Sequence, residues 1–105
     1  IVLISGCSHA GLANTLDYVQ KIIPGRPIYK IIGGFHLLKL NNDKLEWTAK
    51  KMREAGVNYL VGAHCTGLNS TYSIRNFLGL TSKSALVGSV GTVITAKGIF
   101  PGFME

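Results

Sequence analysis

Short apolar runs that end at or near a glycine alternate in this chain with segments of helical periodicity, and this alternation limits the fold more than any other feature. The runs are short and continuous, as is typical of buried strands. Gly88 and Gly91 interrupt the last run, which is expected to form one strand or a pair. Strands separated by helices favour an α/β fold. The four predicted strands are residues 1–5, 27–32, 57–63 and 85–95.

Three helices are predicted between these strands, from apolar residues at helical spacing and from capping residues at the helix ends. Thr66 and Gly67 are expected to shape the loop beside His64, with an ordinary helix cap by Thr66 or Ser70 as the alternative. The helices begin after Ala10, near Asn42 or Asp43, and around Thr71, and they end at Pro24, Gly56 and Leu78.

All three histidines of the chain follow the first three predicted strands. They are His9, His36 and His64, and each has a glycine within the three residues before it. A single histidine in such a place is more often structural. If the strands are parallel, however, the three imidazoles project from one edge of the sheet, where open α/β sheets bind ligands. Neutral imidazoles are ligands for zinc, iron or manganese, so the pattern predicts a shared site and favours a metal in it.

Carboxylates are absent from the segments that follow these strands. A catalytic metal site often includes a carboxylate that orients its ligands and balances the charge of the ion. Either the site holds no metal, or further ligands come from other sequence. The carboxylates of the chain are Asp17, Asp43, Glu46, Glu54 and Glu105.

The composition indicates one small folded domain that is apolar for its size. Of 105 residues, 47% are hydrophobic and only 15% are charged, so part of the apolar surface is expected to be buried against a partner. The chain starts at Ile1 within a strand-like run, and we interpret it as part of a larger fold. Neither a signal peptide nor a membrane-spanning run is recognised. Cys7 and Cys65 are therefore expected to be reduced thiols of a cytoplasmic protein, and a disulfide between them is possible only if their strand ends are adjacent.

The net charge of +6 comes from basic residues that are scattered along the chain. Solvated helix faces are the simplest explanation, and attraction of phosphate-bearing substrates or of nucleic acid are the alternatives. A nucleic-acid-binding module would need these cations on one face, and it leaves the histidines unexplained. A non-catalytic protein that pairs through an exposed half-sheet is a third alternative.

Three segments, "LISGCSHAGLANTL", "IIGGFHL" and "LVGAHCTG", together resemble metallo-β-lactamase-fold metal-dependent hydrolases. The similar group includes the archaeal dihydropterin-ribofuranosyl-aminobenzene-phosphate synthases of methanopterin biosynthesis. The resemblance covers nearly all of residues 1–105 and implies a partial domain, the C-terminal half of an αββα sandwich. It also implies a site for one or two ions of zinc or another divalent metal in the complete enzyme.

Matched by motif, the resemblance makes His9 and His64 metal ligands. It places His36 in a loop lining the same cleft, for substrate or acid–base work, with metal ligation as the second choice. Cys7 lies close to where many relatives have a bridging aspartate and is a weaker candidate ligand. The His-x-His-x-Asp-His motif of the family does not occur in the sequence.

The activity implied by this resemblance is hydrolysis of a phosphate or related ester by a metal-activated water. His36 would pass protons, and cationic residues would hold a phosphorylated small-molecule substrate. The alternatives are the pterin-forming condensation within the same group and a basic nucleic-acid-binding module. The chain alone is expected to bind metal weakly and to be inactive until the missing N-terminal half or a second copy is supplied. No membrane partner is expected.

Overall fold

The computed structural model describes residues 1–102, so Glu105 of the sequence analysis lies outside the described part. The helices are α1 (Leu12–Ile22), α2 (Asn42–Ala55) and α3 (Leu68–Leu78), and a single 3₁₀ turn, η1 (His64–Thr66), precedes α3. The strands are β1 (Val2–Ser5), β2 (Lys30–Gly33), β3 (Tyr59–Gly62), β4 (Ala85–Val87), β5 (Val93–Ile94) and β6 (Ile99–Phe100).

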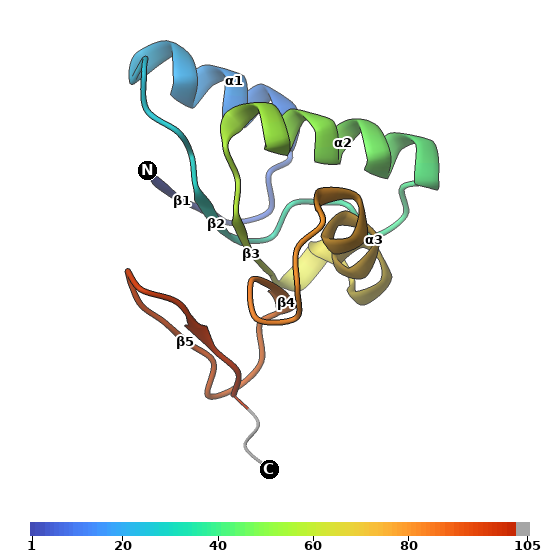
Figure 1. The fold of residues 1–105 in the computed structure, drawn as a ribbon. Coiled ribbons are helices and arrows are strands. Elements are labelled where there is room, and N and C mark those ends of the chain that lie inside the picture. Colours follow the sequence, from blue (N-terminus) through green and yellow to red (C-terminus); the bar gives the residue numbers. More distant parts are fainter. Residues whose placement is uncertain (103–105) are drawn as a thin grey trace.

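Four strands form one parallel sheet in the order β1-β2-β3-β4. A helix connects each strand of the sheet to the next, and each crossover steps to the next strand in the same direction. Right-handed crossovers of this kind place all the helices on one face of the sheet, and Figure 1 shows α1, α2 and α3 on that face. The predicted α/β class with a parallel sheet is confirmed.

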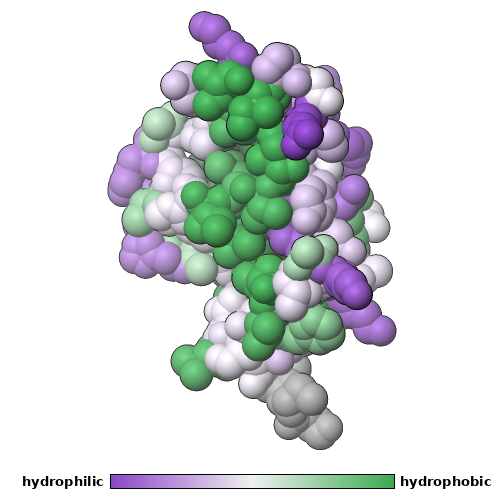
Figure 2. Space-filling view, turned by 90° about the vertical axis from the view of Figure 1, so that its left-hand side faces the viewer, coloured by the Kyte–Doolittle hydropathy of each residue, from purple (hydrophilic) through white to green (hydrophobic). Residues whose placement is uncertain are grey.

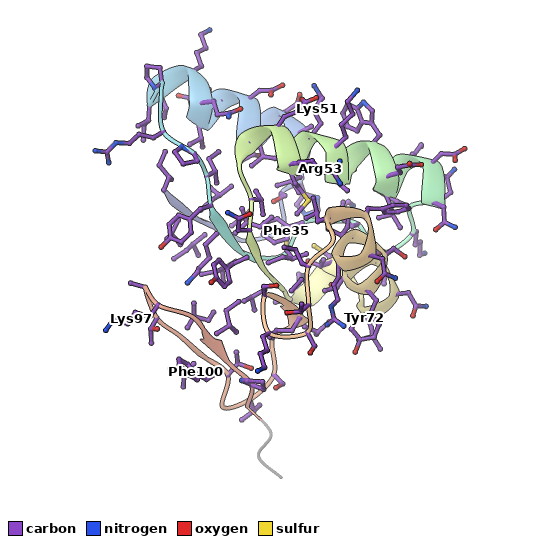
Figure 3. The ribbon with its side chains drawn as sticks, viewed as in Figure 1. Phe35, Lys51, Arg53, Tyr72, Lys97 and Phe100 are labelled. Atoms are coloured by element: carbon purple, nitrogen blue, oxygen red, sulfur yellow. The ribbon has the colours of Figure 1, made fainter. Side chains whose placement is uncertain are left out.

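Alternate strand residues serve two separate hydrophobic clusters, as the period of a strand requires. Ile31 and Leu60 face the helices in the main core. Ile32 and Val61, their neighbours in the strands, belong to a smaller cluster on the opposite face, which the hairpin β5–β6 covers with Ile99. Figure 3 shows Phe35 in the interior, between the sheet and the helices, where it is 1% exposed.

Lys30 joins the hairpin to the sheet. The basic residues were expected to lie on solvated helix faces, but Lys30 is buried in a strand. It is 1% exposed, and its Nζ donates a hydrogen bond of 2.6 Å to the Thr95 carbonyl oxygen. The same ammonium lies 4.8 Å from the centre of the Tyr59 ring, within range of a cation–π contact. A basic residue in strand β2 therefore serves packing rather than solubility.

The last predicted run forms a pair of strands, which is one of the two forms expected for it, whereas the cap of one helix and the start of another differ from the prediction. Residues 85–95 form β4 and then β5, and β5 leaves the sheet to pair with β6 as an antiparallel hairpin. Helix α2 starts at Asn42 as predicted, but its cap is Asn41 and not Asn42 or Asp43, because the Asn41 side chain accepts the Lys44 amide at 3.0 Å. Helix α3 starts three residues early because Gly67, at φ 85°, makes the turn that precedes it.

An apolar stripe remains on the surface beside the edge strand. Figure 2, which views the molecule from the side of β1, shows hydrophobic residues running down that face. Val2 and Ile4 of β1 are 42% and 75% exposed. Edge strands are open to pairing with another chain, and this surface agrees with the excess of apolar residues in the sequence. Within residues 1–102, no helix combines the length and the hydropathy that a membrane crossing needs.

Candidate metal centre

Three loops leave the sheet at one edge and at the same level. Ser5, Gly33 and Gly62 are register partners at the carboxyl ends of β1, β2 and β3. The ladder continues one residue further, because the Gly34 amide donates to the Gly6 oxygen at 2.9 Å and the Ala63 amide donates to the Gly33 oxygen at 2.9 Å. The parallel arrangement assumed in the sequence analysis is confirmed, and the segments that carry the histidines begin side by side.

Each loop contains one residue other than glycine in the left-handed region. Ser8, His36 and His64 have φ values of 54°, 53° and 51°, and they are the only such residues in the described chain. A residue with a Cβ costs of order 1–3 kcal/mol in this region and persists where its surroundings hold it there. Backbone strain of this kind gathers at functional sites, and here it coincides with two of the three histidines.

Glycine is required at the end of β2. Gly33 has φ 131°, and a Cβ there would overlap the backbone oxygen of Ser5 in the neighbouring strand. At Gly34, an added Cβ would also meet the Cys65 sulfur at 3.1 Å. The absence of side chains at these two positions lets the β1 and β3 loops approach each other across the end of β2.

Hydroxyl side chains tie these loops together. Thr66 is 1% exposed, and its Oγ1 accepts the Phe35 amide at 3.0 Å and donates to the Gly33 oxygen at 3.1 Å. Ser70 donates to the Leu37 oxygen at 2.7 Å. Neither residue caps α3, whose cap position is Gly67 without a side-chain hydrogen bond. The alternative that Thr66 or Ser70 caps this helix is therefore wrong, because both hydroxyls hold the β2 loop instead.

Cys7, His64 and Cys65 form a cluster of potential metal ligands. One ligand atom from each side chain lies within 4.8 Å of the other two. The two cysteines are free thiols and half-buried, whereas His64 is exposed. The Cys65 sulfur accepts the His36 amide at 3.2 Å and donates to the Cys7 oxygen at 3.5 Å. Nitrogen and sulfur donors at this spacing fit a zinc-like ion.

His9 and His36 form a separate imidazole pair at the same edge. Their ring centres are 4.7 Å apart and their planes are inclined by 52°. The two histidines predicted as metal ligands are thus found in different groups, His9 beside His36 and His64 beside the cysteines. The assignment of His9 and His64 as ligands stays a prediction, and so does the acid–base assignment of His36.

Two pockets adjoin these groups, and His36 lines both of them. One pocket, of about 360 Å³, also has Lys39 and Cys65 in its wall. The other, of about 300 Å³, extends from His9 to Trp47 of α2. A substrate in either pocket would contact the imidazole of His36, and a phosphate group in the first would meet the cation of Lys39.

Sequence reasoning missed the part that Cys65 and Lys39 take in this site. The signal available for Cys65 was its position beside His64, matching the nearness of Cys7 to His9. Only the register of the three strands shows that the two cysteines meet across Gly34. Lys39 was one scattered cation among eleven basic residues.

The Cys65→Ala variant should react faster than the wild type with iodoacetamide at Cys7. Burial raises the pKa of the Cys7 thiol above its usual value, and the charge of Cys65 and its hydrogen bond raise it further. The thiolate is the nucleophile. Removing Cys65 therefore lowers the pKa of the Cys7 thiol and increases the fraction of Cys7 that is thiolate at a pH below that pKa. We expect the rate in metal-free buffer near pH 8 to rise about 2- to 5-fold, as measured by peptide mass spectrometry. In denaturant the two proteins should react equally, and an unchanged rate in the folded variant would contradict the explanation.

Comparisons with known proteins identify sequences similar to this chain. No family model matches the chain. The 7,8-dihydropterin-6-methyl-4-(β-D-ribofuranosyl)-aminobenzene-5'-phosphate synthase of Methanocaldococcus jannaschii is 34% identical over 70 residues, which are 67% of this chain and 24% of that protein. An uncharacterised protein of the same organism is 29% identical over 96 residues, or 89% of this chain and 33% of its own length.

A solved structure shows the same fold. The crystal structure of a metal-dependent hydrolase of the β-lactamase superfamily superposes with a TM-score of 0.66 and 36% sequence identity. The match covers 71% of this chain and 29% of that one. By fold and sequence, therefore, the chain is similar to β-lactamase-superfamily metal-dependent hydrolases, and the resemblance inferred from the three segments is confirmed. It spans about a quarter to a third of the length of these relatives.

Proposed function

We propose that this chain supplies one wall of the active site of a metal-dependent hydrolase that acts on phosphate or related esters. One observation carries the proposal. All three histidines and both cysteines lie on loops that leave three adjacent parallel strands at one edge, and the structure groups them into a Cys-His-Cys cluster and an imidazole pair. The similarity to a metal-dependent hydrolase supports the same function.

Bound beside these loops, a divalent ion would polarise the ester and lower the pKa of a water molecule toward neutrality. His64 would help to hold the ion, and His9, the second imidazole predicted from the sequence, would either join it or face the substrate. Zinc is the proposed ion because nitrogen and sulfur donors suit it.

His36 is the proposed proton-transfer residue. Its backbone is held in the left-handed region and its amide is bound to the Cys65 sulfur, so the position of its backbone is fixed while its side chain lines the two pockets. An imidazole titrates near neutral pH and can both take and give a proton. Lys39, in the wall of one pocket, is the proposed contact for a phosphate of the substrate.

The proposed site requires further ligands from sequence outside residues 1–105 or from a second copy of the chain. Asp43, Glu46 and Glu54 lie on α2 and Asp17 lies on α1, away from the three loops in sequence. The missing carboxylate and imidazoles would come from an N-terminal half like that of the longer relatives, or from a second copy. The apolar stripe beside β1 is the surface proposed for that contact. Two free thiols in contact fit a reducing compartment, so a cytoplasmic location is proposed.

A pterin-forming condensation is the second candidate, and the identity to the Methanocaldococcus jannaschii synthase favours it about equally. The same imidazole pair would then move protons on a pterin substrate, and the pocket that reaches Trp47 offers an aromatic wall for such a ring. The two candidates differ in their reaction and share the site.

The test restores the missing part of the site. The chain is fused to the part of the Methanocaldococcus jannaschii synthase that it does not match, loaded with zinc, and assayed with bis-p-nitrophenyl phosphate. We expect zinc-dependent release of p-nitrophenol that His36→Ala lowers by about 10²- to 10⁴-fold. Lys21→Ala, at the far end of α1, is the control and should leave the rate unchanged.

Outcomes of this assay separate the two candidates. Formation of the synthase's phosphate product from its precursors, detected by mass spectrometry, without hydrolysis of the ester would replace the hydrolase with the condensing enzyme. A folded, zinc-loaded fusion that does neither would overturn both.

A further inference from the structure

We propose that Cys7 and Cys65 bind the metal ion as two thiolates, with His64 as the third ligand, and that this set selects a thiophilic ion in tetrahedral geometry. The inference rests on the proposed function and deepens it. It differs from the ligand pair predicted from sequence in that the anionic ligands are sulfurs and His9 is not required.

The positions of the donor atoms are the first argument. Tetrahedral bonds of about 2.0–2.3 Å to nitrogen and sulfur place the ligand atoms about 3.3–3.8 Å apart. The three donors of the cluster lie within 4.8 Å of one another. Each separation therefore needs to shorten by about 1.5 Å or less, which side-chain rotation alone can supply.

The architecture holds Cys65 in place beside Cys7 before any ion binds. Cys65 lies in η1, and its backbone oxygen accepts the amides of Leu37 and Leu38, each at 3.1 Å. Its sulfur accepts the His36 amide at 3.2 Å. Gly34 separates Cys65 from Cys7, since an added Cβ there would lie 3.1 Å from the Cys65 sulfur and 3.3 Å from the Cys7 Cα. Glycine at this position lets the two cysteines meet.

Charge is the second argument. The three loops contain no aspartate or glutamate, so imidazoles alone would leave the two positive charges of an ion uncompensated on this wall. Two thiolates supply two negative charges at the same place. The absence of a carboxylate from the loops, which counted against a metal site in the sequence, is thus explained by the cysteines.

The exposure of the Cys7, His64 and Cys65 side chains indicates that a fourth ligand position would be accessible. The cysteines are half-buried and His64 is exposed, so the ion would have protein on one side and an accessible fourth position on the other. Three protein ligands and an open position are typical of catalytic zinc, and two cysteines with one histidine are one of the known sets. His9 and His36 then stay free for substrate and proton transfer.

Cobalt(II) tests the inference because thiolate ligands give it an intense charge-transfer absorption that imidazole and water do not. The metal-free chain, kept reduced with a phosphine, is titrated with cobalt(II) alone and then with competing zinc(II). We expect a charge-transfer band that zinc(II) removes. Cys7→Ser and Cys65→Ser should each lose most of the band and at least about 10-fold in affinity. Lys21→Ala, at the far end of α1, is the control and should keep both within about 2-fold. His9→Ala distinguishes the two ligand sets, because the inference expects it to keep the band.

A measurement on the unmodified chain guards against variants that fail to fold. Zinc(II) should slow the alkylation of both cysteines together, and a chelator should restore it. Cobalt(II) binding without a charge-transfer band, or a band lost in His9→Ala but kept in the cysteine variants, would overturn the inference and leave the proposed function intact. No protection of either thiol by zinc(II) would overturn it as well. Failure of the proposed function would instead be seen as an inactive fusion that still shows the band.

Discussion

Replacing Gly33 with alanine should leave the chain largely unfolded at room temperature. The new Cβ would overlap the backbone oxygen of Ser5, an atom fixed by the pairing of β1 with β2, so no flexible side chain can move aside. The φ of 131° is also a conformation that L-residues rarely adopt. Because both strands belong to the site as well as to the core, we expect a loss of at least about 4 kcal/mol, a large part of the stability of a small domain.

Far-ultraviolet circular dichroism and urea unfolding measure this effect. Gly6→Ala is the matched control, since a Cβ at Gly6 meets nothing within 4 Å. Gly6 directly follows Ser5, the residue that the new Cβ at position 33 would meet. We expect the stability of Gly6→Ala to stay within about 1 kcal/mol of the wild type. A Gly33→Ala chain with an unchanged urea midpoint would show that the β2 end can shift away from Ser5.

Thr66→Val should destabilise the fold by about 1–3 kcal/mol and weaken metal binding about 10-fold or more. Valine has nearly the shape of threonine, so packing is preserved and only the hydroxyl is lost. The buried Phe35 amide then has no acceptor, whereas the Gly33 oxygen keeps the Ala63 amide. An unpaired buried amide drives the β2 loop to move, and that loop carries the His36 amide that binds the Cys65 sulfur.

Thermal unfolding and cobalt(II) titration measure the two effects of Thr66→Val. Thr71→Val is the control, because Thr71 is just as buried but its hydroxyl donates only to the Gly67 oxygen, which also accepts the Thr71 amide. We expect the control to cost less than about 1 kcal/mol and to leave cobalt(II) affinity unchanged. Equal losses in both variants would mean that the bond to Phe35 has no special part in the site.

The order of strands and helices could be predicted because each element has a strong local signal. The apolar runs around Ile31 and Leu60 and the helical spacing in α1 and α2 require no knowledge of the tertiary structure. The hairpin could not be predicted in this way, since β5 and β6 have two residues each and pair only because Ile94 and Ile99 cover the open face of the sheet.

The sequence predicted the sheet edge at which the candidate site lies, but not which side chains contact one another there. Three histidines after three strands are visible in the sequence, and the parallel register brings their loops together. Which side chains meet depends on left-handed turns at Ser8, His36 and His64, and histidine gives little local signal for such a turn. The grouping of His9 with His36, and of His64 with the cysteines, follows from these turns.

The central place of β2 has a consequence for how the chain refolds. β2 pairs with β1 on one side and with β3 on the other, and each pairing joins strands separated by a whole helix. Cys7 comes after the first strand and Cys65 after the third, so neither pairing alone brings the sulfurs together. In a stopped-flow experiment, cobalt colour should therefore develop no faster than the helical signal, and its rate would report the moment when the third strand docks.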